Sequence, residues 1–327
     1  MTALATRPAD PASSLSPGEV CDSVAALIGN TPLVELRSLT AGLGARILVK
    51  LEGRNLGGSS KDRTALSMIR TAEASGALSP GATIVEATSE NTGIGLALIG
   101  RLTGHPVIIV HSADIADEKR KVLAAYGPRL VEALWDAAPD DPANPRAVAD
   151  RIAQEIPGAW RPAQFANTAN PAAHYRGTGP EIWRQTAGRV THFVASVGTG
   201  GTVSGAGRYL KEASGGAVNV VGANPVGSTY GGGQAGRILV DGVGTAWPRE
   251  FWPENFDPAV VDAVDTVEDA AVYCTLRRLA AEEELLLGPS VGARCRRRAA
   301  AGAVGGAGRG HRGRRPRRRG ELPDEGF

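Results

Sequence analysis

The chain has few of the residues that define disulfide-stabilised, metal-binding or membrane proteins. It holds only three cysteines in 327 residues, Cys21, Cys274 and Cys295, and they form an odd and scattered set. This number and spacing exclude a disulfide framework and a cysteine-based metal site, so we expect reduced thiols without a catalytic role. The five histidines also lack metal-ligand spacing. No apolar run approaches the roughly 18 residues that indicate a membrane span.

The N-terminus lacks both common kinds of targeting signal. Residues 1–20 are small, proline-rich and weakly charged, without the apolar core of a secretory signal or the arginine-rich pattern of a transit peptide. We expect them to form a disordered tail, and we expect a cytoplasmic protein with no membrane partner. The hydrophobic fraction of 42% and the charged fraction of 21% are typical of a globular protein, and the length accommodates two domains.

Positive charge is concentrated at the C-terminal end. Residues 294–327 carry 11 arginines and three acidic residues, a net charge of +8, whereas the whole chain carries +2 and the remainder therefore −6. Arginine, glycine, alanine and proline dominate this segment without apolar periodicity, which predicts disorder. A basic nucleic-acid arm is the functional alternative. The segment lacks the ordered pattern of such an arm, so we expect no nucleic-acid partner.

Branched apolar runs alternate with stretches of helical periodicity. After a turn and a short strand within residues 24–36, the predicted strands cover residues 46–52, 83–87, 106–110, 130–133, 192–197 and 218–222. The predicted helices cover residues 65–74, 94–99, 114–126 and 147–155, and a further one runs through Tyr209 and Leu210. Because apolar strands that alternate with helices form parallel sheets covered on both faces, we expect an α/β fold. A second set of elements follows the first, which predicts domains over residues 21–165 and 166–293.

Lys61 follows a loop of small residues and precedes the first predicted helix. Gly57 and Gly58 allow the backbone to approach a bound group closely, and Ser59 or Ser60 can cap the helix. The positive end of the helix dipole disfavours the charge of a lysine placed here. A neutral lysine is a nucleophile that forms a Schiff base with an aldehyde. Taken alone, the residue fits a solvated surface lysine beside a capped helix better, because lysine is usually exposed.

Two further loops join a strand to a helix and are rich in glycine and hydroxyl groups. Residues 198–202, Gly-Thr-Gly-Gly-Thr, can hold a phosphate through backbone N–H groups, the helix N-terminus and the threonine hydroxyls. Their spacing is neither that of a dinucleotide fingerprint nor that of a P-loop. Residues 88–93, Thr-Ser-Glu-Asn-Thr-Gly, can bind a carboxylate in a similar way. Singly, each loop is also compatible with an ordinary turn at a capped helix start.

A glycine-rich motif at residues 288–292 contains Ser290, whose hydroxyl can bond a ring nitrogen without carrying charge. The same Gly-x-Ser-x-Gly pattern is found in hydrolase nucleophile elbows, which need an acid and then a histidine later in the chain. The only later histidine is His311, inside the arginine-rich segment. We therefore reject the hydrolase interpretation.

Taken together, the motifs resemble those of the fold-type II pyridoxal-phosphate enzymes, in the cysteine synthase and cystathionine β-synthase family. The matching stretches, in order, are residues 28–33, 57–63, 88–93, 174–183 and 198–202. The resemblance covers residues 24–293, and residues 222–228 and 239–258 look most like bacterial cystathionine β-synthases. It implies two three-layer α/β domains with mainly parallel sheets, as in the tryptophan synthase β subunit. The cofactor would lie between the domains, an N-terminal arm would cross to the second domain, and the protein would be a homodimer.

The resemblance also implies the role of each site residue. Lys61 would form the Schiff base with pyridoxal 5′-phosphate and later move the substrate α-proton. The remaining cofactor-binding residues would be Asn91 at the ring hydroxyl, Ser290 at the pyridine nitrogen, and Gly198, Thr199, Gly200, Gly201 and Thr202 at the phosphate. The substrate carboxylate would be held by Thr88, Ser89, Thr92 and Gln164. No metal is expected.

The implied reaction is β-replacement on L-serine or an O-activated serine through an aminoacrylate. A neutral serine at the pyridine nitrogen leaves the ring a weaker electron sink, which suits β-elimination. Cystathionine β-synthase, which joins serine and homocysteine, is the preferred interpretation. The alternatives are cysteine synthase, which joins O-acetylserine and sulfide, and a non-catalytic member of the family that binds the cofactor or a partner.

The chain departs from the family pattern at two places. Glu90 stands where the family normally has glycine, and it adds a negative charge beside the expected carboxylate site. If the backbone there required a positive φ, Glu90 would add strain as well, so we expect weaker substrate binding, altered specificity or low activity. After Ala293 the family continues with an apolar helix and a strand. We interpret residues 294–327 as a frameshift in a GC-rich gene, restored just before Leu322, and we expect it to expose apolar surface and to cost stability.

Overall fold

The computed structural model describes residues 20–21, 23–113, 115–134, 137–138 and 140–292. The predicted N-terminal tail lies outside these residues apart from Val20, and so do the proposed frameshift and Cys295. The other two cysteines, Cys21 and Cys274, are free thiols. No helix in the described part of the chain combines the length and the hydropathy that a membrane crossing requires.

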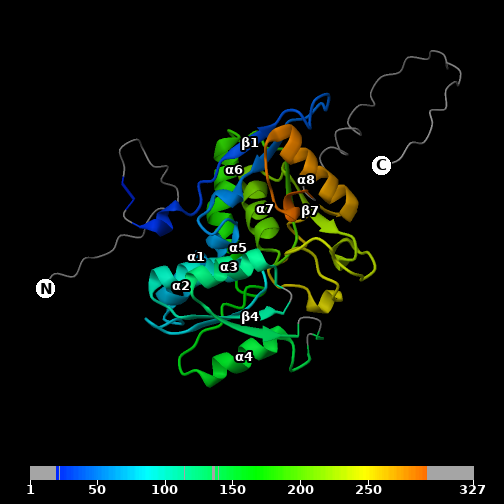
Figure 1. Ribbon diagram of the computed structural model, residues 1–327. Helices are drawn as coiled ribbons and strands as arrows, with labels where there is room; N and C mark the ends of the chain where they lie inside the picture. The colour runs from blue at the N-terminus through cyan, green and yellow to red at the C-terminus, as the bar shows by residue number, and fades with distance from the viewer. Residues whose placement is uncertain (1–19, 22, 114, 135–136, 139, 293–327) are drawn as a thin grey trace, which may run out of the picture.

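The N-terminal half is built on a parallel sheet with helices on both faces. In spatial order the strands are β3 (Ile84–Ala87), β4 (Val107–Ser112) and β5 (Arg129–Ala133). The helices are α1 (Lys61–Ser75), α2 (Asn91–Thr103), α3 (Asp117–Tyr126) and α4 (Pro145–Glu155). Figure 1 shows α4 below this sheet and α1, α2 and α3 above it. β4 is buried along its whole length, as its uninterrupted apolar run predicts.

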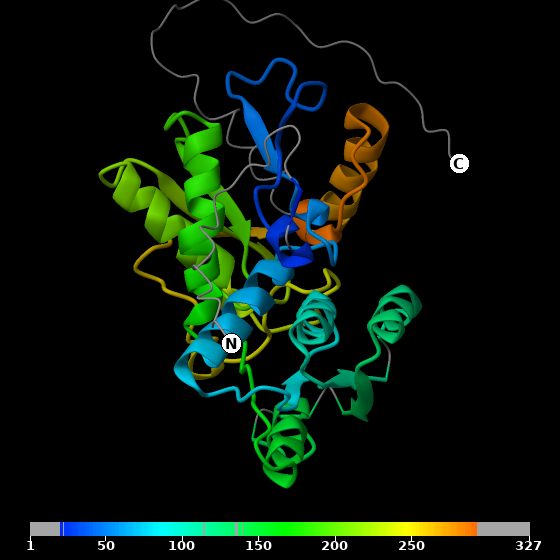
Figure 2. The same cartoon turned by 90° about the vertical axis from the view of Figure 1, so that its left-hand side faces the viewer.

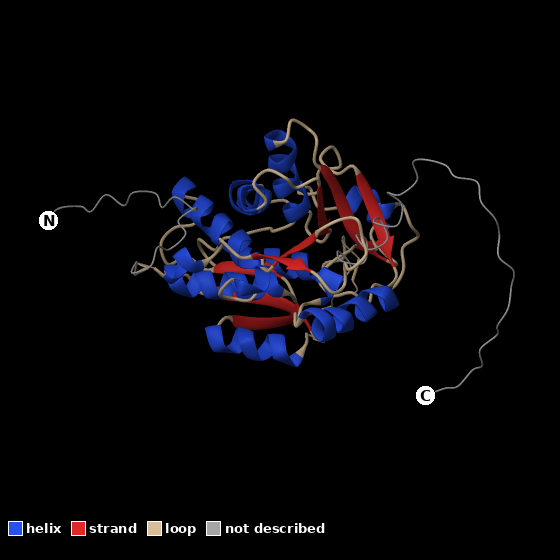
Figure 3. Ribbon diagram, turned by 90° about the horizontal axis from the view of Figure 1, so that it is seen from above, coloured by secondary structure: helices blue, strands red, loops and turns tan. Residues whose placement is uncertain are grey.

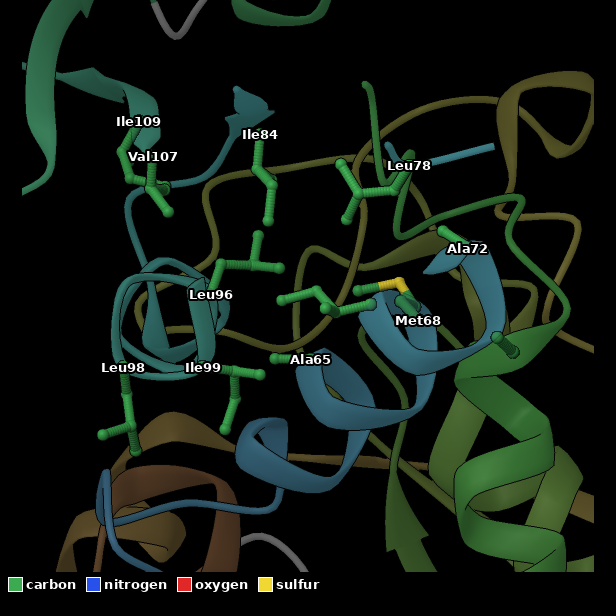
Figure 4. Packing of buried hydrophobic residues seen from close by; sticks show 12 residues of the cluster. Ala65, Met68, Ala72, Leu78, Ile84, Leu96, Leu98, Ile99, Val107 and Ile109 are labelled. Atoms are coloured by element: carbon green, nitrogen blue, oxygen red, sulfur yellow. The ribbon is translucent and has the colours of Figure 1, made fainter. Parts of the chain in front are cut away.

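The core of this half lies between α1 and α2. Ala65, Met68 and Ile69 lie on one face of α1 at helical spacing and are fully buried in one cluster with α2 and the sheet. Figure 4 shows Ala65 and Met68 on the side of α1 that faces α2. Gly95 of α2 permits the close approach of the two helices, because a Cβ there would come within 2.9 Å of the Lys61 carbonyl oxygen. The packing of the core therefore fixes the start of α1, where Lys61 lies.

The C-terminal half repeats the arrangement with a second parallel sheet, which Figure 3 shows apart from the first. Its strands, in spatial order, are β6 (His192–Ser196), β7 (Asn219–Pro225) and β8 (Ala263–Val267). Its helices are α5 (Ala169–Ala173), a π-helical turn (His174–Thr178), α6 (Gly179–Gln185), α7 (Gly201–Ala213) and α8 (Asp269–Glu283). Along β6 the side chains alternate: Phe193 and Ala195 join the cluster of α7, whereas Val194 joins that of α8. The predicted two-domain α/β fold with parallel, three-layered sheets is confirmed.

A short antiparallel hairpin near the N-terminus packs on the C-terminal half. It consists of β1 (Leu33–Leu36) and β2 (Ile47–Lys50), and Leu36 and Val49 pack with Leu279 of α8. The backbone N–H groups of residues 37 and 39 donate to the carboxylate of Glu283, at the end of the same helix, at 3.1 and 2.8 Å. Figure 2 shows the hairpin beside α8. The remaining short helices are 3₁₀ turns: Val24–Leu27, Glu52–Arg54, Thr229–Gly231 and Arg249–Phe251.

Several element boundaries differ from those predicted. α1 begins at Lys61, four residues before the predicted start, because the polar residues Lys61 to Thr64 form its first turn. α3 begins at Asp117 rather than at residue 114. β8 and α8 lie outside the predicted elements altogether. β8 carries Asp265 and Thr266 and is only partly buried, so it lacks the apolar run that marks the other strands.

Candidate functional site

A cavity of about 1140 Å³ lies between the two halves of the molecule. The predicted site residues that line it are Lys61, Asn91, Gly198, Thr199, Gly200, Thr202 and Ser290. They come from four separate places in the sequence: the start of α1, the start of α2, the loop between β6 and α7, and the motif after α8. The fold thus gathers the lysine, the glycine-rich loop and the serine motif around one space.

Lys61 is the first residue of α1 and faces this cavity. Its backbone N–H donates to the Ser59 hydroxyl at 3.2 Å, so Ser59 caps the helix. Ser60 occupies the formal N-cap position but makes no side-chain cap bond. Gly58 has φ +84°, a conformation that residues with a side chain rarely adopt. The loop can therefore turn sharply and present Lys61 to the cavity at the positive end of the helix dipole.

Asp62 is fully buried next to Lys61 and holds the same loop in place. One carboxylate oxygen accepts the Gly57 N–H at 2.6 Å, whereas the other, Oδ1, has no hydrogen-bond partner among the described residues. Residue 57 must be glycine, because a Cβ there would lie 2.5 Å from Oδ1. Burial raises the pKa of Asp62 to about 6, and the nearby Glu52 carboxylate adds to this rise.

The raised pKa predicts a stability change with pH that Asp62→Asn should remove. Because the pKa of Asp62 is higher in the folded chain than its ordinary 3.8, its contribution to stability is fully present below about pH 4 and is lost as the pH rises through about 6. Two pKa units correspond to roughly 2–3 kcal/mol. Denaturant unfolding at intervals from pH 4 to 7.5 should show a flatter stability profile for the variant. Parallel profiles for the two proteins would contradict this assignment.

The loop of residues 198–202 lies at the N-terminus of α7, where backbone N–H groups have no acceptor within the helix. Three of its glycines are sterically required. A Cβ at residue 198 would lie 2.8 Å from the Gly242 carbonyl oxygen, one at residue 200 would lie 2.5 Å from the backbone of Phe256, and one at residue 201 would lie 2.0 Å from Asn170. The loop is therefore a bare backbone surface with free room only on the cavity side, as an anion-binding loop requires.

The surroundings of this loop hold it rigidly. The Thr199 hydroxyl accepts from the Asn170 side chain at 3.0 Å, and the Thr202 hydroxyl lies 3.1 Å from a ring nitrogen of His174. The Tyr230 hydroxyl donates to the Gly198 carbonyl at 2.8 Å. No local sequence pattern assigns this role to Asn170, His174 or Tyr230. Only His174 carried a signal, as a member of one matching stretch.

Gly200→Ala is expected to weaken cofactor binding by about 10-fold or more. The new methyl group would collide with the Phe256 backbone and would occupy a residue whose φ is +84°, and strain of this kind costs on the order of 1–3 kcal/mol. Titration of the apoprotein with pyridoxal 5′-phosphate measures the effect. Gly44→Ala is the matched control, because a Cβ there meets nothing within 4 Å. Equal affinity of both variants for the cofactor would contradict the phosphate role of the loop.

The four predicted carboxylate-binding residues do not line the cavity. Thr92 and Gln164 are buried and bond each other at 2.6 Å, and the Gln164 amide also donates to the Ala87 carbonyl at 3.4 Å. Ser89 accepts the backbone N–H of Ser112, at the end of β4, at 2.7 Å. The fourth residue, Thr88, is buried, and its hydroxyl accepts the backbone N–H of Glu90 at 3.1 Å. Their role toward a substrate therefore stays a prediction.

Glu90 does line the cavity, and the positive φ that would have strained this residue is absent. Its φ is −125° and its ψ is −170°, an extended conformation that any residue adopts. Its carboxylate forms an ion pair with Lys119 of α3, which also lines the cavity. The negative charge that we expected beside the carboxylate site is thus compensated by a cation 29 residues away in sequence.

A buried network of charged side chains lies near the start of α1, two residues from Lys61 at its nearest member, Arg63. Glu181 of α6 binds Arg63 at 2.6 Å and Lys50 at 2.6 Å, and Arg63 also binds Glu52 at 2.7 Å. Burial alone would raise the pKa of Glu181, but the bonds to Arg63 and Lys50 outweigh it and lower the pKa to about 2. The network ties α1 to α6 and to β2, and it lies outside the residues that the sequence analysis proposed.

A lysine at a helix N-terminus, facing a glycine-rich anion-binding loop across a cavity between two α/β units, defines a site for a phosphate-bearing aldehyde cofactor. The family profile described as "Pyridoxal-phosphate dependent enzyme" matches residues 24–307. The chain belongs to this family of pyridoxal-phosphate-dependent enzymes. The loop around residues 198, 200 and 201 has no room for a Cβ, so its backbone is open to a phosphate group. Lys61 and Ser290 line the same cavity, and this set of residues fits the cofactor.

Individual relatives carry two kinds of name. Cysteine synthase B of Pseudomonas aeruginosa is 41% identical over 270 residues, which cover 83% of this chain and 85% of that protein. Cystathionine beta-synthase of Saccharomyces cerevisiae is 40% identical over 282 residues, which cover 81% of this chain but 54% of that protein. Among solved structures, a hydrogen sulfide-producing enzyme from Fusobacterium nucleatum has a TM-score of 0.82 at 32% identity, covering 88% of this chain and 93% of that one. These relatives place the chain in the β-replacement branch of the family.

Proposed function

We propose that the chain catalyses β-replacement of an O-activated L-serine by sulfide, the cysteine synthase reaction. The supporting observation is that the chain matches a cysteine synthase B over 85% of that protein's length. This reverses the preference that the sequence motifs suggested. The proposal also retains the expected homodimer, which sedimentation of the purified protein would test.

The proposed roles are those that the family resemblance implies, and the lining of the cavity by these residues supports them. The Lys61 amine would bind the cofactor aldehyde, the loop of residues 198–202 would hold its phosphate, Asn91 would contact its ring hydroxyl and Ser290 its ring nitrogen. When bound, pyridoxal 5′-phosphate supplies the electron sink that makes the substrate α-proton acidic. The Lys61 amine nitrogen would accept that proton, and the packed helix α1 that carries the lysine would hold it in position.

The substrate carboxylate would be held at the start of α2. Residues 88–93 run from the loop before α2 into the first turn of this 13-residue helix, whose first backbone N–H groups have no intrahelical acceptor. For the Thr88, Ser89, Thr92 and Gln164 side chains to take part, their present bonds to one another and to β4 must be exchanged for bonds to the substrate. We infer that the loop moves toward the cavity when substrate binds, which would also exclude water.

Cystathionine β-synthase activity, with L-serine and homocysteine, is the second candidate. Relatives with this name are as similar in sequence over the shared region, at 38% to 41% identity. Residues 222–228 run along the end of β7 and beyond it, and they carry the sequence resemblance to this group.

Visible absorption of the cofactor-loaded protein tests both candidates. A spectral change on addition of O-acetyl-L-serine but not of L-serine, followed by release of cysteine when sulfide is added, supports the first. A change with L-serine and formation of cystathionine from homocysteine supports the second. A spectrum that no serine derivative alters, with no product from either acceptor, would overturn the proposed function.

A further inference from the structure

Glu90 and Lys119 form a charge pair on the wall of the cavity that holds Lys61. The Glu90 backbone N–H donates to the Thr88 hydroxyl, so the main chain stays in the loop before α2, while the side chain reaches Lys119 on α3. Both side chains are largely shielded from water, with 33% and 23% of their surface exposed. The pair is therefore close enough to the reaction site for its charge to act on a bound molecule.

The same carboxylate reaches the opposite side of the cavity. A Cβ built on Gly242 would lie 3.4 Å from Glu90 Oε2, so the pair lies where the loop before α2, α3 and the segment of residues 241–243 meet. Asp241 lines the cavity beside Gly242 and adds a further negative charge there. A molecule bound in the cavity therefore lies near this group of charges.

Two other cations on the cavity wall, Arg46 and Lys50, are also compensated, whereas Arg189 on the same wall donates to the Thr186 carbonyl oxygen at 3.2 Å. Arg46 pairs with Glu35 at 2.8 Å, and Lys50 pairs with Glu181 at 2.6 Å. A bound anion would gain little from Lys119 while Glu90 is attached to it, and it would be repelled by Asp241. With a glycine at residue 90, the Lys119 ammonium would instead be available to an anionic substituent.

We propose that Glu90 selects the leaving group of the serine donor by charge: it neutralises Lys119, so the site accepts donors with an uncharged substituent, such as a hydroxyl or an acyl ester, and discriminates against phosphate esters. This inference rests on the proposed β-replacement and specifies its donor class. Of the three effects expected of Glu90, weaker substrate binding, altered specificity or low activity, it specifies the second.

Binding and turnover are measured in parallel on the cofactor-loaded protein. Isothermal titration calorimetry with L-2-amino-4-phosphonobutyrate and with L-norvaline compares an anionic with an uncharged side chain, and neither compound has a β-leaving group. The variants are Glu90→Gln, Glu90→Gly, Lys119→Met and the double variant Glu90→Gln/Lys119→Met. Glu118→Gln, which removes an exposed carboxylate that does not line the cavity, is the matched control.

Glu90→Gln and Glu90→Gly are expected to tighten binding of the phosphonate by about 10-fold, the effect of one uncompensated charge, and to leave norvaline within about 3-fold. The kcat/KM ratio of O-phospho-L-serine to O-acetyl-L-serine should rise by a similar factor. The gain should vanish in the double variant, and Glu118→Gln should not produce it. Phosphonate affinity that stays unchanged in both Glu90 variants, or a gain that persists without Lys119, would overturn the proposal. Lack of turnover with every serine donor would contradict the proposed function, and the donor selectivity with it. The calorimetry would still decide whether Glu90 weakens the binding of an anionic side chain.

Discussion

Lys61→Ala is expected to lower the rate of β-replacement by about 10³-fold or more while the fold remains intact. The lysine is proposed to bind the cofactor and to carry the α-proton, and positioned proton transfer alone contributes roughly 10²–10⁴-fold. Because the side chain faces a cavity and not the core, its removal should change the melting temperature little. Steady-state rates with O-acetyl-L-serine and sulfide, and with L-serine and homocysteine, give the comparison.

Lys121→Ala is the matched control for this prediction. Lys121 is an exposed lysine on α3 that does not line the cavity, so the variant should retain the wild-type rate. If Lys61→Ala kept a rate within 10-fold of the wild type, the assignment of Lys61 as the reacting lysine would be wrong.

Glu181→Gln is expected to destabilise the fold by about 3–5 kcal/mol, the usual cost of removing one partner of a buried ion pair. The change leaves the Arg63 guanidinium and the Lys50 ammonium without the carboxylate that each contacts at 2.6 Å. Because domains have only about 5–15 kcal/mol of stability in total, denaturant unfolding should show a large shift of the midpoint. Glu282→Gln, in an exposed pair with Arg278, should leave the midpoint where it is.

The same residue predicts how the protein responds to acid. The pKa of Glu181 is lowered from 4.5 to about 2 in the folded chain, so its stabilising contribution is present above about pH 4.5 and is lost as the pH falls toward 2. The wild type should therefore lose stability more steeply than Glu181→Gln below pH 4.5. Identical acid profiles would show that the carboxylate is not the charged partner of this network.

The motifs of the site that consist of a few consecutive residues could be predicted, because those residues alone determine what the motif can bind. Lys61 follows a glycine-serine loop, and residues 198–202 form a glycine-threonine loop. Each of these loops leads into a helix, and both Lys61 and the second loop line the same cavity. The α/β architecture was predictable for a similar reason, since apolar runs such as β4 have few alternatives to a buried parallel strand.

The parts that depend on contacts between distant segments could not be predicted from the residues alone. Glu90 meets Lys119 across 29 positions and Arg63 meets Glu181 across 118, and nothing in the local pattern of either residue identifies its partner. β8 was missed because the strand is half polar and only partly buried. The strain considered for Glu90 depended on a positive φ, which the sequence could not decide, and the residue is extended.

The central claim is that Lys61 attaches the cofactor in the cavity between the two halves. Borohydride reduction of the cofactor-loaded protein, followed by proteolysis and peptide mass spectrometry, tests it most directly. The account predicts that the cofactor is found covalently fixed to Lys61 and is absent from Lys121 and the other lysines. A label on a different lysine, or a loaded protein in which reduction fixes no cofactor at all, would contradict the account.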